Sequence, residues 1–163
     1  MKKILLLIAV VFFSSCLKKE QKEIFSTIVI NLSHSQYPKQ ITIDSQKSQI
    51  EYKNLNEVLA ASADANKGLS DSKIVSLDEA SLKEILNLFE AIDTTSQKRN
   101  KSEKGMYSSI EAHAKDGKIL NIDQLNDRHA DEVVFMEAVL KSIAVASKDT
   151  EVQKETKILV RAL

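Results

Sequence analysis

The chain has 163 residues, of which 43% are apolar and 28% are charged, and its 23 basic residues balance its 23 acidic ones. This composition is ordinary for a globular domain and lacks the basic excess of nucleic-acid-binding proteins, so we expect no nucleic-acid partner. Three glycines, one proline and no tryptophan argue against a loop-rich disulfide scaffold or a sugar-binding scaffold.

The first segment has the layout of a secretory signal peptide. Lys2 and Lys3 precede ten consecutive apolar residues, from Ile4 to Phe13, and two serines follow. The alternative is a membrane-spanning helix, which needs roughly 20 apolar residues to cross a hydrocarbon core about 30 Å thick. The apolar run is half that length, so we predict export, with residues 1–15 as the signal peptide.

Cys16 follows the two serines directly and is the only cysteine in the chain. The segment Phe13-Ser14-Ser15-Cys16 resembles the lipobox of bacterial lipoproteins, in which small residues precede an obligatory cysteine. The resemblance implies that the Cys16 thiol receives diacylglycerol, that cleavage precedes Cys16, and that the new amine is acylated. An exported protein normally pairs its cysteines, and lipidation accounts for this single one. Two or more acyl chains hold a membrane stably, so Cys16 is the predicted anchor.

Residues 16–23 continue as a polar run of mixed charge, which predicts a solvated tether between the anchor and the domain. In the lipoproteins that the chain resembles, an aspartate directly after the cysteine favours inner-membrane retention in some bacteria. Leu17 occupies that position here and favours the outer membrane. The expected location is therefore the cell envelope, with membrane attachment through the lipid on Cys16 and an envelope protein as a candidate partner.

Cleavage before Cys16 would leave 148 of the 163 residues, with 21 basic and 23 acidic side chains. This length suffices for one compact domain with a core, which we place at residues 24–163.

The domain begins with a predicted three-stranded antiparallel meander. Apolar residues alternate with other residues in three short stretches, namely Ile28, Ile30 and Leu32, then Ile41 and Ile43, then Ile50 and Tyr52. This alternation places them on one face of a sheet. In the first strand, Phe25, Thr27 and Val29 are expected on the opposite face. Residues 54–75 favour neither a helix nor a loop clearly.

The best-defined helix follows Ser76-Leu77-Asp78-Glu79, which matches a capping box with Ser76 as the N-cap. Apolar residues then recur at helical spacing: Leu82, Ile85, Leu86, Phe89 and Ile92. Such a stripe indicates a core-facing helix. The polar and basic residues 94–104 predict a surface loop.

Residues 106–123 predict a β-hairpin whose register can be derived. A two-residue turn at Asp116 and Gly117 would pair Ile110 with Asp123 and mix the two faces. A three-residue loop over 115–117, with Gly117 left-handed, pairs Ile110 with Ile122 and Ala112 with Leu120. Only this loop brings apolar residues together, so we predict the bulged hairpin.

A second long helix is predicted from Val133 to Val145, with Asp127 or Asp131 as its cap. The tail from Glu151 to Leu163 is either a helix starting at Thr150 or an edge strand, and we favour the helix. The elements together predict an α+β fold in the order βββ-α-ββ-α. Two main helices would pack on one face of an antiparallel sheet of about five strands.

The candidate chemistry is sparse. His129 lies with Asp127 and Asp131 in the cluster 126–132, which could hold a metal or a general base and would then serve a hydrolase. Acidic residues are also favoured at a helix N-terminus, and we prefer that explanation. His34 falls in a loop, and His113 is expected on a solvent-facing strand surface. We predict no catalytic residue, cofactor or resident metal.

The domain also resembles, loosely, an uncharacterised class of small bacterial lipoprotein domains. The shared pattern is a strand meander, a helix like SLDEASLKEILNLFE and a hairpin closed by KDGK. This resemblance implies no activity. The leading hypothesis is a non-enzymatic, lipid-anchored binding module, and the hydrolase is the alternative. A third hypothesis is an interaction subunit that uses strand edges or the face of Tyr107, His113 and Ile119.

Overall fold

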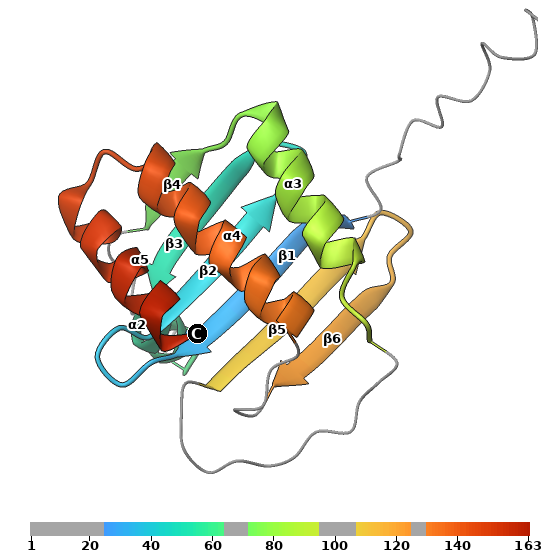
Figure 1. The fold of residues 1–163 in the computed structure, drawn as a ribbon. Coiled ribbons are helices and arrows are strands. Elements are labelled where there is room, and N and C mark those ends of the chain that lie inside the picture. Colours follow the sequence, from blue (N-terminus) through green and yellow to red (C-terminus); the bar gives the residue numbers. More distant parts are fainter. Residues whose placement is uncertain (1–24, 64–71, 95–106, 125–129) are drawn as a thin grey trace, which may run out of the picture.

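The computed structural model describes residues 25–63, 72–94, 107–124 and 130–163 (Figure 1). The elements, in chain order, are β1 (Phe25–Ser33), β2 (Lys39–Asp44), β3 (Gln49–Asn54), α2 (Leu55–Ala63), β4 (Lys73–Ser76), α3 (Glu79–Glu90), β5 (Tyr107–Ala114), β6 (Ile119–Gln124), α4 (Ala130–Ala146) and α5 (Thr150–Ala162). The predicted α+β class is confirmed. Three elements add to the predicted order βββ-α-ββ-α. Two of them, α2 and β4, come from residues 54–76, most of which favour neither a helix nor a loop clearly, and the third is α5 in the tail.

Within these ranges, six strands form one antiparallel sheet in the order β4-β3-β2-β1-β5-β6. The predicted meander is confirmed, and β4 extends it by one strand. After α3 the chain returns to pair β5 with the other side of β1. The first strand therefore lies inside the sheet, as expected of its β-branched sequence.

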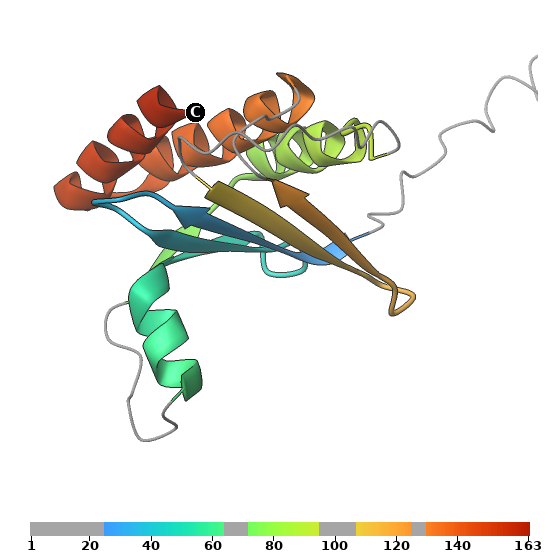
Figure 2. The same ribbon diagram turned by 90° about the horizontal axis from the view of Figure 1, so that it is seen from below.

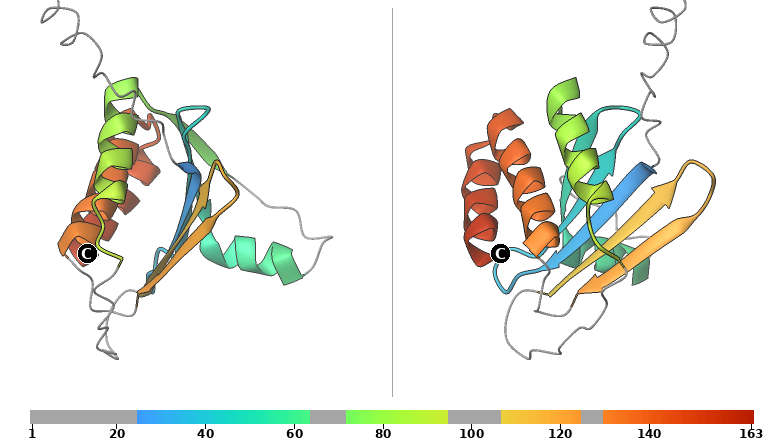
Figure 3. Two further views of the ribbon diagram at one scale, coloured as in Figure 1. Left: turned by 90° about the vertical axis from the view of Figure 1, so that its right-hand side faces the viewer. Right: turned by 45° about the vertical axis from the view of Figure 1, so that its right-hand side comes forward.

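The helices α3, α4 and α5 cover one face of the sheet, and α2 projects from the other side (Figures 2 and 3). The core lies between the sheet and the three-helix layer. It contains the alternating strand residues and the helix stripes, among them Ile28, Ile30, Ile41, Ile43, Ile50, Ile110, Ile122, Phe89, Phe135, Met136, Ile143 and Leu159. Full burial of one such side chain stabilises the fold by about 1.5–3 kcal/mol. No helix in the described ranges has the length and apolar character needed to cross a membrane.

The start of β1 departs from the expected alternation. A register shift between Phe25 and Thr27 lets the Phe25 side chain turn to the helix layer, where its ring forms a T-shaped pair with that of Phe89, at 4.9 Å between centroids. The Ser26 hydroxyl donates to the His113 carbonyl at 3.0 Å across this irregularity. The prediction that Phe25 shares a face with Thr27 and Val29 was wrong, because a one-residue irregularity moves a side chain to the other face.

The cap of α3 is Asp78 and not Ser76. Ser76 pairs with Gln49 as the last residue of β4, which keeps it extended. An Asp78 carboxylate oxygen accepts from the backbone amide of Ser81 at 2.7 Å, and this bond is the first cause of the lowered pKa of Asp78. The helix therefore starts two residues later than the capping-box pattern predicted, because pairing with β3 extends to Ser76.

The predicted hairpin register is confirmed. Ile110 pairs with Ile122 and Ala112 with Leu120. Gly117 has φ +87°, the left-handed conformation that the three-residue loop requires. The loop is closed by hydrogen bonds of the Ala114 amide to the Lys118 carbonyl, at 2.8 Å, and of the Gly117 amide to the Ala114 carbonyl, at 3.1 Å.

The two C-terminal helices lie where the sequence predicts them, but the first of them begins earlier. The helix α4 begins three residues before Val133, so Asp131 lies in its first turn and is not its cap. Asp127, the other predicted cap, lies outside the described residues. The helix α5 starts at Thr150 as favoured, and the Asp149 carboxylate caps it by accepting from the Glu151 amide at 2.9 Å.

The antiparallel order gives the sheet two distinct ends. At one, which we call the Phe25 end, β1 begins and the β2–β3 and β5–β6 turns lie. At the other, the Lys39 end, β2 and β4 begin and β3 leads into α2. β1 spans nine residues, so its two ends are roughly 27 Å apart at about 3.3 Å per residue.

Candidate functional site

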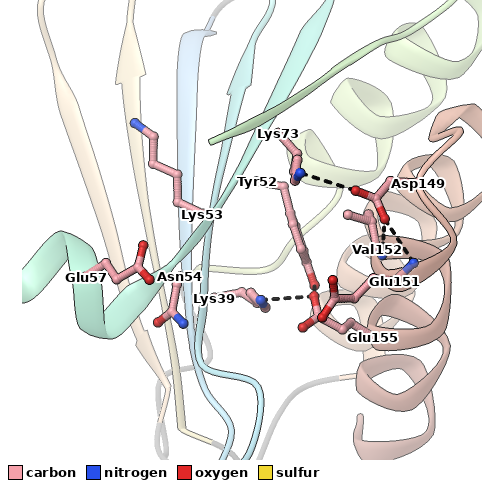
Figure 4. Close-up of a pocket in the computed structure, with 10 residues that line it drawn as sticks. All are labelled: Lys39, Tyr52, Lys53, Asn54, Glu57, Lys73, Asp149, Glu151, Val152 and Glu155. Atoms are coloured by element: carbon pink, nitrogen blue, oxygen red, sulfur yellow. Dashed lines mark hydrogen bonds and ion pairs between the residues drawn. The ribbon is translucent and has the colours of Figure 1, made fainter. Parts of the chain in front are cut away.

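A polar pocket of about 250 Å³ lies at the Lys39 end of the sheet (Figure 4). Its walls come from the start of β2 and β4, the end of β3, the first turn of α2 and the first two turns of α5. The lining residues are Lys39, Tyr52, Lys53, Asn54, Glu57, Lys73, Asp149, Glu151, Val152 and Glu155. We call this cavity the Lys39 pocket.

The floor of the pocket is a buried ion pair. Lys39 is only 8% exposed, because its side chain shares the core-facing side of β2 with Ile41 and Ile43. Its Nζ lies 2.9 Å from Glu155 Oε2, and 5.0 Å from the centroid of the Tyr52 ring. A lysine is seldom buried without a partner, and the carboxylate and the ring face together compensate its desolvation.

Tyr52 completes the floor and keeps its proton. Its hydroxyl donates to Glu155 Oε2 at 3.2 Å. Burial, and then the negative charge and hydrogen bond of Glu155, raise the pKa of the Tyr52 phenol well above its usual range. The phenol therefore remains a hydrogen-bond donor at physiological pH and does not act as a base.

The helix α5 forms one wall, held in place by Asp149. The Asp149 carboxylate caps the helix, and its second oxygen lies 3.3 Å from Lys73 Nζ at the start of β4. The backbone amides of Glu151 and Val152, followed by Lys73, lower the pKa of Asp149. This capping and pairing ties the first turn of α5 to the edge strand of the sheet.

The opposite wall is formed by the end of β3 and the start of α2. Lys53 extends from β3 and pairs with Glu51 on the same strand at 2.8 Å. The Asn54 side-chain oxygen accepts from the Asn56 amide at 3.0 Å, which orients the first turn of α2 and with it Glu57. In Figure 4 Glu57 and Glu155 project from the two opposite walls.

The lining has three lysines and four carboxylates. Each of the lysines already has a carboxylate within 3.3 Å, and the partner of Lys53 lies outside the lining. Carboxylates thus outnumber lysines in the lining by one. Its chemistry suits the binding of a small polar or charged group.

The predicted cluster at 126–132 is not assembled by the described residues. His129 and Asp127 lie outside them. Asp131 accepts from the Asp93 amide at 2.8 Å through Oδ2 and from the Glu132 amide at 3.1 Å through Oδ1, so it joins the start of α4 to the end of α3. Among the described residues no group of three or more His, Cys, Asp or Glu side chains is arranged to hold a metal.

The two other histidines lie far apart. His34 follows β1 at the Lys39 end, where its Nδ1 accepts from the amides of Gln36 and Tyr37. His113 pairs with Thr27 at the opposite end of β1 and contacts Glu111 at 2.6 Å. His113 lies on the face turned away from the helix layer, as predicted, directly across from Ile119. Cys16 lies outside the described residues.

Sequence reasoning missed the residues of the Lys39 pocket. One signal was present, because Lys39 occupies a position of β2 that the alternation assigns to the core with Ile41 and Ile43. Its partner Glu155 is more than 100 residues away in the chain. Only the docking of α5 on the sheet brings the two together.

Comparison with known proteins gives no match for this chain: no family model, no curated protein and no solved structure matches it.

Proposed function

We propose that the protein is a lipid-anchored, non-enzymatic module of the bacterial cell envelope that binds an envelope protein through the Lys39 pocket. The lipid on Cys16 attaches it to the membrane, with the outer membrane favoured. The short apolar segment that ends in a single cysteine supports the proposed location in the cell envelope. The position and chemistry of the pocket support the binding role.

The observation on which the proposal chiefly rests is the placement of the pocket relative to the tether. Residues 16–23 join the domain just before Phe25, at one end of β1. The pocket lies at the other end of the strands, roughly 27 Å away by the length of β1. A domain held at Phe25 can therefore present the pocket to the aqueous compartment while it stays anchored.

The lining favours binding over catalysis. Tyr52 retains its proton, and the Lys39 ammonium is ion-paired with Glu155, so neither is poised for proton abstraction or nucleophilic attack. The rival hydrolase would use His129, and Asp131 is already engaged with backbone amides. Metal bound to the purified protein and lost in His129→Ala would favour that rival.

Site-specific photo-crosslinking in intact cells tests the binding role. A photoreactive residue at Lys73, an exposed position on the pocket wall, is compared with one at Val145, which is 86% exposed on α4 and does not line the pocket. We expect a discrete crosslinked protein from position 73 and none from position 145. Equal crosslinking at both positions, or crosslinking from neither, would contradict the assignment of the pocket.

A third position addresses the alternative interaction face. Ile119 is 56% exposed next to His113 on the face away from the helices. A crosslink obtained at Ile119 and not at Lys73 would transfer the binding role from the pocket to this sheet face.

A further inference from the structure

We infer that the Lys39 pocket binds a primary ammonium group, as found in a small amine or in the side chain of a lysine. This inference rests on the proposed binding function and specifies its ligand chemistry. It is drawn from the cavity itself, from the pairing of its lysines and from the unused carboxylate oxygens of α5.

The pairing of the lysines disfavours an anionic ligand. Lys39, Lys53 and Lys73 lie 2.9, 2.8 and 3.3 Å from carboxylate oxygens. Their positive charge is therefore compensated before any ligand arrives. An anion entering the pocket would meet neutralised lysines and the Glu151 carboxylate.

Two carboxylates on α5 offer acceptors to a cation. Both contacts of Glu155 within the described part of the chain end on Oε2, which leaves Oε1 available, and its side chain is only 12% exposed. Glu151 lies one turn earlier on the same face of α5, and the described residues form no hydrogen bond or ion pair with its carboxylate. Like charges at this spacing repel each other, and a cation placed between them removes the repulsion.

The size and geometry of the cavity favour an ammonium group over a metal ion. About 250 Å³ corresponds to about eight water molecules, enough for an alkylammonium of a few carbon atoms. The Lys39 ammonium lies 2.9 Å from the Glu155 carboxylate and would repel a divalent ion bound there about twice as strongly as a singly charged ammonium. An alkylammonium brings a single charge and three donors, which suit the two carboxylates.

The test uses n-butylamine as the probe and butyrate as its match in chain length with the opposite charge. Each is titrated at constant ionic strength into the full lipidated protein in non-ionic detergent, and binding is followed by the amide NMR signals of residues 150–156. We expect saturable shifts with n-butylamine and none with butyrate. A blocked Gly-Lys-Gly peptide that binds more tightly than n-butylamine would identify a protein lysine as the source, and weaker peptide binding would identify a small amine.

Two carboxamide variants locate the contact. Glu151→Gln should weaken n-butylamine binding about tenfold, which corresponds to about 1.4 kcal/mol. Glu84→Gln, an exposed acid on α3, should leave it unchanged. Absence of saturation, binding of butyrate, or equal affinity in Glu151→Gln would overturn the inference. Crosslinking from position 73 would stand independently of these results, so a failure here is distinguishable from a failure of the proposed function.

Discussion

Replacement of Lys39 by methionine probes the ion pair at the floor of the pocket. The substitution keeps most of the side-chain volume but leaves the Glu155 carboxylate with Tyr52 as its remaining partner. Breaking a fully buried pair costs about 3–5 kcal/mol, because an uncompensated charge stays in a poorly solvated site. The Glu155 side chain retains 12% exposure. We therefore expect a loss of about 2–3 kcal/mol in the free energy of unfolding.

Urea unfolding of the purified full chain, followed by circular dichroism, measures this loss. The midpoint should fall while the slope with denaturant stays constant, because the surface exposed on unfolding is unchanged. Lys141→Met is the matched control, since Lys141 is 63% exposed and pairs with Glu137 on the surface of α4. Its cost should stay below about 0.5 kcal/mol, as for exposed helix pairs.

A double-mutant cycle separates the pair from the packing of the lysine stem. Glu155→Leu removes the charge that Lys39→Met would otherwise leave without its ion partner. The double variant should therefore be more stable than the sum of the two single effects predicts, by at least about 1 kcal/mol. A Lys39→Met cost below about 0.5 kcal/mol, or strictly additive effects, would refute the assignment of a buried ion pair.

Three further predictions follow from the fold. Gly117→Ala should destabilise the protein by about 1–2 kcal/mol in thermal unfolding. The cost is backbone strain alone, because φ of Gly117 is +87° and the added Cβ meets no neighbouring atom. An unchanged unfolding midpoint would contradict the left-handed turn. Ile110→Ala, at a core position, should lower the free energy of unfolding in urea by about 2–5 kcal/mol, whereas Ile119→Ala, at an exposed position, should lower it by less than about 0.5 kcal/mol. Equal losses would refute the register of the β5–β6 hairpin. The pKa of Asp149 is lower in the folded state than in the unfolded state, where it is near 3.8, so the stability that the Asp149 carboxylate contributes is fully present above the unfolded pKa and is lost as pH falls through the folded pKa. The difference in unfolding free energy between the wild type and Asp149→Asn should therefore shrink as pH falls through that range. A constant difference would contradict the charge interaction.

Much of the fold follows from local pattern. Alternation in β1, β2 and β3 predicts the meander, and matching faces select the correct register of the β5–β6 hairpin. These features are predictable because a strand with one buried face strongly restricts its register.

The departures have physical causes that a single sequence does not display. The helix α2 has a weak apolar stripe, since it projects from the sheet and leaves Leu59 57% exposed. The edge strand β4 is only four residues long, and its pairing with β3 moves the start of α3 to Asp78. The register shift after Phe25 reverses one side chain without changing the overall pattern.

The Lys39 pocket could not be predicted from the sequence for a different reason. Its floor joins Lys39 and Tyr52 from neighbouring strands to Glu155 near the C-terminus. Residue spacing carries no information about a contact that depends on where α5 docks. The predicted cluster around His129, in contrast, consists of residues that are neighbours in the sequence. In the structure Asp131 joins the end of α3 to the start of α4.

Mass spectrometry of the N-terminal peptide of the protein isolated from cell membranes shows whether Cys16 carries the lipid anchor. We expect a peptide that begins at Cys16 and bears the mass of a diacylglycerol and a further acyl group. A peptide that retains residues 1–15, or one in which Cys16 is unmodified, would contradict it.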